Sequence, residues 1–256
     1  MTMVTDQELR QSRKRFLELA EKSYRQSVYC FTGFLDMAQL DLFYGMQREL
    51  SHVPCTLFGG HAGSERQMVR FGSDEMMGYE EPFPIVCLEI RPLQEKFADR
   101  LTHRDFLGAC MNLGIDRSTL GDILLRENTA YLFCTEVIAD YVAESLTRVR
   151  HTSVACRRYA GATGDLQPVR ERREYQVTSE RLDSVAARVF GLSREAGRQL
   201  LQERKVSVNG RIRESGSSTP KEGDIISVRG YGKFVYQGMT HRTRKGKCNI
   251  AVDVYV

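Results

Sequence analysis

The stretch RLDSVAARVFGLSREAGRQLLQERKVSVNGRIRESGSSTPKEGDIISVRG, residues 181–230, decides the fold of the C-terminal part of this chain. Its first half has apolar residues at helical spacing, interrupted once, so it predicts two consecutive helices. Ser179 and Ser193 are the expected N-caps of these helices, because a serine hydroxyl can accept from free backbone N–H groups. Two short strands follow, joined at Asn209-Gly210, which is the strongest short signal for a hairpin. The stretch therefore predicts two helices followed by a small sheet.

The second predicted helix carries a basic face. At 100° per residue, Arg194, Arg198 and Lys205 fall within about 40° of one another. A helix N-terminus with two arginines one turn apart suits phosphate groups, because its free N–H groups add to the side-chain charge. Arg181, which opens the first helix, and Arg211, just past the hairpin turn, can join this surface. The alternative is an ordinary solvated helix face, and the pattern alone does not separate the two.

The charge of the chain is unevenly distributed. Residues 1–169 contain 19 Lys and Arg against 23 Asp and Glu, which is a net charge of −4. Residues 170–256 contain 18 against 10, which is +8, so the whole chain carries +4. A basic C-terminal part on a mildly acidic body favours a polyanion as its partner. A well-solvated surface is the alternative.

Upstream of the basic part, GATGDLQPVRERRE at 161–174 is rich in glycine and charge, and it predicts a linker over residues 161–178. The preceding block alternates between strand and helix patterns in the order βαββαβ. This order predicts a ferredoxin-like or RRM-like sheet with two helices on one face. The strands are expected at 85–91, 121–126, 129–134 and 151–159, and the helices at 103–114 and 135–148. In the second helix the apolar stripe is expected to consist of Val137, Ile138, Tyr141, Val142 and Leu146.

The first 80 residues predict a small α/β domain. A long amphipathic helix is expected over residues 6–28 and a second helix over 36–50. The sequence VPCTLFGGHAG then predicts a strand that enters a glycine-rich turn. This turn lacks the Lys-Ser/Thr of a phosphate loop and the spacing of a dinucleotide fingerprint, so close backbone packing is the favoured interpretation. HRD at 103–105 lacks the other motifs of a protein kinase, and His103 and Asp105 are expected to fix the start of their helix.

The composition and the N-terminal sequence bear on whether the chain is a membrane protein, a secreted protein or a metal-binding protein. The chain has 256 residues, no apolar run long enough to span a bilayer, and a polar N-terminal sequence that does not resemble a secretory signal, so a cytoplasmic protein is expected. Seven cysteines at irregular spacing lie mostly in apolar stretches, so we expect reduced, buried thiols; a zinc site or a disulfide framework is the disfavoured alternative. We expect no metal and no cofactor.

Over about 50 residues the C-terminal stretch resembles the ribosomal-protein S-four RNA-binding domain. The motifs that carry the resemblance are RLD at 181–183, LSR at 192–194, VSVNG at 206–210 and the P…GD…V pattern at 220–228. Two positions depart from the family pattern: Gly197 stands where Ala is typical, and Arg204 stands where a helix-ending Gly is usual. The resemblance implies that RNA is held through shape and phosphate contacts by Arg181, Ser193, Arg194, Arg198, Lys205 and Arg211.

RGYGKFVY at 229–236 partly matches the aromatic strand motif of RRM domains, but it lies outside the βαββαβ block. Tyr231 and Lys233 from this segment are predicted to be secondary RNA contacts of the C-terminal domain. Within the block, Tyr131 and Phe133 share one face of the third strand without the RRM pattern. Base stacking is therefore not required of that domain, and a packing or partner role is at least as well supported.

A longer resemblance, to the YlmH family of bacterial ribosome-associated proteins, covers nearly the whole chain. Its markers are FGGHAGSER at 58–66, HRDFLGACMNLGI at 103–115, GDI at 121–123 and RGYGKF at 229–234. This resemblance implies an N-terminal domain, an RRM-like domain and an S-four domain in that order. It also implies association with large ribosomal subunits, especially stalled ones that still carry peptidyl-tRNA, and a role in ribosome-associated quality control.

Together these observations predict an α+β protein of three small domains. The expected bounds are 1–80 for the N-terminal α/β domain, 81–160 for the RRM-like domain, 161–178 for the linker, and 179–256 for the S-four domain with a C-terminal β extension. We expect a non-catalytic protein that binds rRNA or tRNA on the large subunit. The alternatives are an RNA-modifying enzyme with an appended S-four domain, although the signature motifs of such enzymes are absent, and a protein-interaction adaptor.

Overall fold

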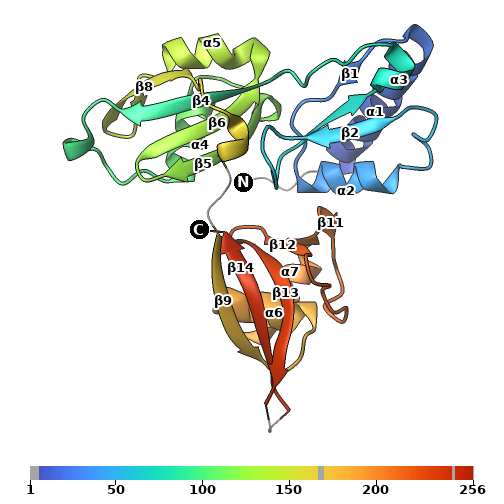
Figure 1. Cartoon of the computed structure of the whole chain (residues 1–256), viewed down its shortest axis with the longest axis vertical. Coiled ribbons are helices and arrows are strands. Elements are labelled where there is room, and N and C mark those ends of the chain that lie inside the picture. The colour runs from blue at the N-terminus through green and yellow to red at the C-terminus, as the bar shows by residue number, and fades with distance from the viewer. Residues whose placement is uncertain (1–5, 167–169, 244–245, 256) are drawn as a thin grey trace. The chain divides into compact units, whose positions relative to one another are not determined.

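The computed structural model describes residues 6–166, 170–243 and 246–255, with helices and strands in a mixed α+β arrangement (Figure 1). The chain divides into two compact units, Met1–Gln167 and Pro168–Val256. Among the described residues the first unit contains a three-stranded and a five-stranded sheet, and the second unit contains a six-stranded sheet. The predicted N-terminal and central domains therefore pack together in one unit, and the boundary between them at residue 80 stays a prediction.

The N-terminal part of the first unit is built around a small antiparallel sheet with strand order β1-β3-β2. Phe16 of α1, Phe43 of α2 and Phe71 of β3 form its core, with ring centroids of neighbouring pairs 5.7 and 6.4 Å apart. The elements are α1 (Asp6–Gln26), β1 (Cys30–Phe31), α2 (Met37–Gly45), β2 (Cys55–Phe58), β3 (Met68–Phe71) and α3 (Asp74–Met77). Helix α2 is shorter than predicted, because irregular turns replace it after Gly45.

The central part has the predicted βαββαβ order. Its elements are β4 (Ile85–Pro92), α4 (His103–Asn112), β5 (Leu120–Arg126), β6 (Thr129–Thr135), α5 (Glu136–Ser145) and β8 (Thr152–Arg158), with a short extra strand β7 (Arg148–Val149). The antiparallel sheet has the order β5-β6-β4-β8-β7, which is the strand order of the ferredoxin-like fold extended by β7. Helices α4 and α5 cover one face and enclose a single apolar core with it (Figure 1).

The predicted apolar stripe of α5 is wrong at two positions. Val137 is 91% exposed and Tyr141 is 49% exposed, whereas Ala139 and Val142 are buried. The buried face of the helix therefore consists of Ala139 and Val142, with Ile138 and Leu146 beside them. The predicted stripe included two positions that are exposed. At the start of α4 the prediction is confirmed for Asp105, because its carboxylate accepts from the backbone N–H and the hydroxyl of Thr102 at 2.8 and 2.7 Å. The same role for His103 stays a prediction.

The glycine-rich turn after β2 joins the two sheets of this unit. A Cβ atom on Gly60 would lie 2.3 Å from the ring of Phe133 in β6, and the backbone there has a φ of +97°. The buried His61 ring has Nε2 3.2 Å from the Asp122 carboxylate of β5, and Nδ1 2.9 Å from the carbonyl of Ala62. Asp122 also accepts from the backbone N–H of Arg66 at 3.1 Å. Close backbone packing, the interpretation favoured by the sequence, is confirmed.

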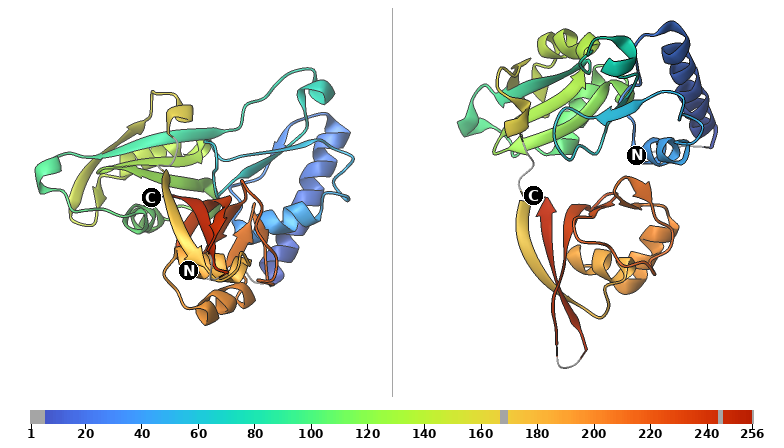
Figure 2. Two further views of the ribbon diagram at one scale, coloured as in Figure 1. Left: turned by 60° about the horizontal axis from the view of Figure 1, so that its bottom comes forward. Right: turned by 45° about the vertical axis from the view of Figure 1, so that its right-hand side comes forward.

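The second unit is a six-stranded antiparallel sheet with two helices on one side (Figure 2). Its elements are β9 (Arg170–Val177), α6 (Leu182–Val189), α7 (Arg194–Gln202), β10 (Val206–Val208), β11 (Arg211–Ile212), β12 (Ile225–Val228), β13 (Gly232–Arg242) and β14 (Cys248–Tyr255). The sheet order is β11-β10-β12-β13-β14-β9, and β13 and β14 run side by side as a long hairpin (Figure 2).

Three predictions about the second unit need correction. Residues 170–177 are not linker: they form β9, which pairs with β14 along its whole length, so a charge-rich sequence here makes an edge strand. Helix α6 begins at Leu182 with Arg181 as the N-cap residue, and Ser179 makes no cap. Helix α7 ends at Gln202, so Lys205 follows the helix and does not share its face.

Candidate nucleic-acid interface

The N-terminus of α7 is built as the sequence predicts. The Ser193 hydroxyl oxygen accepts from the backbone N–H of Ala196 at 3.1 Å, so Ser193 caps the helix. Arg194 is the first residue of the helix, and Arg198 follows one turn later; both side chains are exposed. The helix dipole at this end favours an anion, and the two arginines add full positive charges close by.

Asp183 organises the arginines of the two helices. Its fully buried carboxylate accepts from Nε and Nη2 of Arg181 at 3.1 and 3.0 Å, and Nε of Arg198 lies 3.6 Å away. The side chains of Arg181 and Arg198 remain 40% and 57% exposed. Arg181 therefore uses one edge of its guanidinium group on the buried carboxylate, Arg198 forms an ion pair with it, and both groups keep N–H donors toward solvent, an arrangement suited to phosphate oxygens.

The protonation of Asp183 follows from its surroundings. Burial alone raises the pKa of its carboxyl group, but the hydrogen bonds and charge of Arg181, the backbone N–H of Ser184 and the charge of Arg194 outweigh burial and hold the pKa below its usual value. Asp183 is therefore an anion at neutral pH. With three arginines around it, this cluster has a net positive charge of two.

Glycines allow the close packing that buries Asp183. A Cβ atom on Gly197 would lie 2.7 Å from the Asp183 carbonyl oxygen, and one on Gly216 would lie 2.5 Å from the Asp183 Cβ. The loop that contains Gly216 also accepts from the free N-terminal N–H groups of α6: Leu182 N donates to Ser218 O at 2.9 Å. Gly197 in place of the typical Ala thus permits a close approach of α6 and α7.

The other predicted contacts near α7 lie at its far end and on the hairpin. Lys205 pairs with Glu203 at 2.5 Å and is 38% exposed, and Arg211 is exposed at the start of β11. Arg204, which precedes Lys205, has a φ of +56°, so the usual left-handed turn is kept although the residue is not glycine. The helix therefore ends as in the family pattern, at the cost of backbone strain.

Tyr231 and Lys233 are placed differently from each other. Tyr231 is 50% exposed at the turn before β13, with its ring centroid 6.0 Å from that of Phe190. Lys233 is 9% exposed, and its Nζ lies 4.4 Å from the centroid of the Tyr255 ring. Since its neighbour Phe234 points into the core beneath the helices, Lys233 lies on the opposite face of the sheet. The structure therefore does not bring Lys233 to the arginines of α6 and α7.

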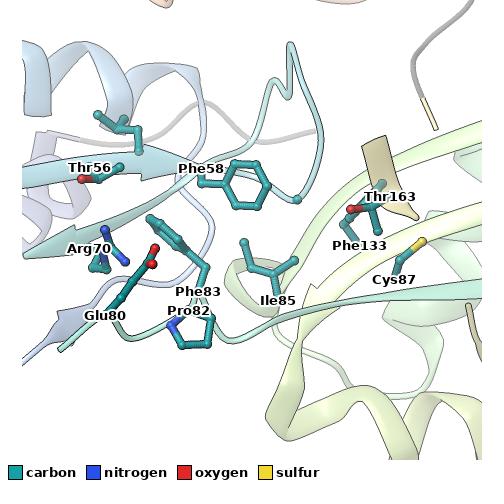
Figure 3. Close-up of a pocket in the computed structure, with 12 residues that line it drawn as sticks. Thr56, Phe58, Arg70, Glu80, Pro82, Phe83, Ile85, Cys87, Phe133 and Thr163 are labelled. Atoms are coloured by element: carbon teal, nitrogen blue, oxygen red, sulfur yellow. The ribbon is translucent and has the colours of Figure 1, made fainter. Parts of the chain in front are cut away.

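The central sheet does not present aromatic rings for base stacking. Tyr131 is 8% exposed and Phe133 is fully buried, because residues of the N-terminal part pack over this end of the sheet. A cavity of about 400 Å³ lies at this junction, with Phe58 and Phe83 on one side and Ile85 and Phe133 on the other (Figure 3). The packing role weighed for these aromatic residues is the one that the structure shows.

Asp183 is the residue whose role the sequence did not reveal. By itself, a position in the first turn of a helix indicates only a favourable interaction with the helix dipole. The role of Asp183 depends on its contacts with Arg181 and with Arg198 of the next helix, and the second contact exists only when α6 and α7 are packed together.

Among the described residues, no group of three or more His, Cys, Asp or Glu could hold a metal ion. No helix within the described ranges is long and apolar enough to cross a membrane.

The fold and the surface of the second unit define an RNA-binding protein with an S4 domain, the S-four module named above. Residues 180–226 match the family model of the S4 domain, and residues 79–161 match the model described as a putative RNA-binding domain in YlmH. The chain is therefore similar to YlmH proteins in its central part, and its C-terminal unit contains an S4 domain.

Two relatives and one solved structure show how far the similarity extends. The chain is 27% identical to the ribosome-associated protein quality control protein P2 of Bacillus subtilis, over 92% of this chain and 90% of that protein. It is 40% identical to the small ribosomal subunit protein uS4 of Chromohalobacter salexigens, over 28% of this chain and 32% of that protein. It is also similar to the structure of the cell division protein ylmH from Streptococcus pneumoniae, with 22% identity, a TM-score of 0.48, and coverage of 62% of this chain and 95% of that chain.

Proposed function

We propose that this protein is a non-catalytic factor that binds RNA on the large ribosomal subunit and acts in quality control of stalled complexes that carry peptidyl-tRNA. The observation that carries the proposal is the cluster in which buried Asp183 holds Arg181 and Arg198 beside Arg194 at the start of α7. The name of the Bacillus subtilis relative, which is similar over most of its length, supports the ribosome as the place of action.

The proposed contacts are electrostatic. Arg181, Arg194 and Arg198 would bind phosphate groups of folded RNA, with Ser193 positioning the helix start and Lys205 and Arg211 extending the contact. Because phosphate neutralisation would supply most of the affinity, binding should weaken steeply as salt rises. Tyr231, which is half-exposed, is proposed as a secondary contact. The burial of Lys233 counts against a direct contact by its ammonium group. A protein with these partners would act in the cytoplasm.

The proposal is tested by sedimentation of a lysate that contains the tagged protein through sucrose gradients, at low and at raised salt. The wild type is compared with Arg194→Ala/Arg198→Ala and with Arg188→Ala, which removes an exposed arginine elsewhere on α6. We expect the wild type and Arg188→Ala to migrate with the large subunit at low salt, and the double variant to stay at the top. If the wild type stays at the top under every condition, the ribosomal part of the proposal is wrong.

A further inference from the structure

The central sheet has a second face that the helices do not cover. Because α4 and α5 pack on one face, alternate residues of each strand point to the other. The register places Leu124, Tyr131, Glu89 and Arg157 in one row across β5, β6, β4 and β8. The next row outward contains Arg126, Thr129, Arg91 and Ala155. This second face is therefore apolar at one end and basic at the other.

The apolar end of this face is packed against the N-terminal part of the unit. Phe133 and Cys87 are buried there together with Phe34 and Met68. At the basic end, the side chains of Arg91 and Arg157 are 52% and 68% exposed. Arg126 is also exposed, although its Nη2 donates to the carbonyl oxygen of Asp165, so the described residues leave the basic end open to a ligand mainly at Arg91 and Arg157.

Buried Glu89 fixes the two arginines in place. Its side chain is 3% exposed, and its carboxylate accepts from Arg91 Nη2 at 2.6 Å and from Nε and Nη2 of Arg157 at 2.8 Å. This is the arrangement found around Asp183, where one buried carboxylate also orients two half-exposed arginines. In both places the carboxylate lowers the conformational freedom of the guanidinium groups before a ligand arrives, which reduces the entropy lost on binding.

Two more arginines extend the same surface. Arg126 ends β5 in the outer row, and Arg148 of β7 pairs with Ser153, which lies on the same side of β8 as Arg157. Among the described positions in these rows and in the β7–β8 pair, four are arginine and one, Glu89, is acidic, so the net charge is +3. Such a concentration is notable because residues 1–169 as a whole carry a net charge of −4.

We infer that Arg91, Arg126, Arg148 and Arg157 form a second RNA-binding surface that contacts backbone phosphates. Phosphates are favoured over stacked bases because the aromatic residues of this face are buried. RNA is favoured over an acidic protein because the arginines are spread over four strands, β5, β4, β8 and β7, as a row of phosphates along a backbone requires. The family model that matches residues 79–161 is described as a putative RNA-binding domain, and the inference assigns to that region the face, the residues and the phosphate contacts. It deepens the proposed function, on which it rests for RNA as the ligand, and it uses arginines of the first unit in addition to those of the second.

Adjacent arginines in β8 provide a matched pair for the test. Arg157 belongs to the open face, whereas Arg158 points to the helix side, where it pairs with Glu136 and Asp140 of α5 at 2.8 Å. Arg157→Gln and Arg158→Gln therefore make the same change in charge on opposite faces. Arg157→Gln leaves Arg91 as the partner of Glu89. Arg126→Gln is a second variant of the open face that does not touch Glu89 at all.

The dissociation constant of each full-length variant is measured by fluorescence anisotropy with a labelled RNA hairpin, at constant salt. We expect Arg157→Gln and Arg126→Gln each to weaken binding about threefold, the combination to weaken it about tenfold, and Arg158→Gln to leave it unchanged. If both open-face variants bind as tightly as Arg158→Gln, the inference is overturned, and an acidic protein becomes the ligand to consider.

The same assay separates this inference from the proposed function. Arg198→Gln removes an arginine of the second unit and leaves the central sheet intact. If Arg198→Gln weakens binding and the open-face variants do not, the second surface is wrong and the proposed function stands. If the open-face variants weaken binding and Arg198→Gln does not, the second surface stands and the RNA contacts proposed for α6 and α7 are wrong.

Discussion

The carboxylate of Asp183 accepts two hydrogen bonds from the guanidinium group of Arg181, at 3.1 and 3.0 Å, although the aspartate is buried and the arginine is 40% exposed. The same carboxylate lies 3.6 Å from Nε of Arg198 on the neighbouring helix. One buried charge thus sets the position of basic side chains from two helices. Removing that charge should affect both the stability of the second unit and its affinity for RNA.

Asp183→Asn tests this double role. Because a neutral amide cannot balance the charge of two guanidinium groups, we expect the free energy of unfolding of the second unit to fall by about 2 kcal/mol. This loss is smaller than for a fully buried ion pair, since water screens the exposed arginines. Urea unfolding followed by hydrogen exchange in α6 would measure the loss. We expect RNA binding to weaken as well, under conditions where the variant is folded. An Asp183→Asn variant with unchanged stability and affinity would show that the carboxylate has neither role.

The low pKa of Asp183 predicts a pH dependence. A carboxyl group whose pKa is lower in the folded state than in the unfolded state stabilises the fold at neutral pH, and this stabilisation is lost as pH falls through the folded-state pKa. The difference in unfolding free energy between wild type and Asp183→Asn should therefore be constant above about pH 5 and shrink below about pH 4. Urea midpoints measured for both proteins from neutral to acidic pH would check this. A difference that stays constant down to the acid range would contradict it.

Two helical glycines predict opposite responses to alanine. A Cβ atom on Gly108 in α4 would meet nothing within 4 Å, so Gly108→Ala should stabilise the first unit by about 0.5–1 kcal/mol through helix propensity. At Gly197 the new methyl group would meet the Asp183 carbonyl oxygen at 2.7 Å and the Ala187 Cβ at 2.9 Å. Gly197→Ala should therefore destabilise the second unit by about 1–3 kcal/mol. Thermal unfolding of both variants shows whether the unfolding temperature rises or falls relative to the wild type. A higher unfolding temperature for Gly197→Ala would contradict the close approach of α6 and α7 at this position.

The left-handed backbone of Arg204 predicts a stabilising substitution. Glycine adopts a φ of +56° without the steric cost that a side chain brings, so Arg204→Gly should stabilise the second unit by about 1 kcal/mol. The exposed pair of Arg204 with Glu214, at 3.3 Å, should offset little of this gain. The shift in urea midpoint measures the effect. A decrease in stability would mean that the arginine side chain contributes more than the strain costs.

Four cysteines of the central part, Cys110 in α4 and Cys87, Cys134 and Cys156 in the sheet, should resist modification. Burial raises the pKa of Cys110 to about 11 and the pKa values of Cys87, Cys134 and Cys156 to about 12, so almost no thiolate is present at neutral pH. All seven cysteines are free thiols, as the sequence predicted. We expect a thiol reagent to modify these four slowly in the native protein and rapidly in urea, as followed by mass spectrometry. Rapid modification of Cys134 in the folded protein would contradict its burial.

Much of the fold was predictable because local signals agreed with tertiary packing. The βαββαβ order of the central part followed from apolar periodicity, and the hairpin of β10 and β11 from Asn209-Gly210. The misassigned linker shows the limit of such signals. Residues 170–177 are charged at most positions, which is typical of a loop, but they form an edge strand whose hydrogen bonds come from the distant β14.

The candidate site could be predicted only in part for the same reason. Arg194, Arg198 and their cap Ser193 are local to one helix, so spacing alone identified them. The role of Asp183 depends on the packing of α6 against α7. The pairing of Glu89 with Arg157 joins two residues that are 68 positions apart in the sequence. No pattern within a short window contains this information.

The central claim is that arginines held by Asp183 bind RNA phosphates, and the salt dependence of binding tests it most directly. The logarithm of the binding constant for a labelled RNA hairpin is plotted against the logarithm of salt concentration for the wild type, Arg198→Gln and Arg188→Gln. Each phosphate contact contributes roughly 0.9 to the slope on a duplex, so Arg198→Gln should reduce its magnitude by about one while Arg188→Gln leaves it unchanged. Equal slopes for all three proteins would contradict the claim.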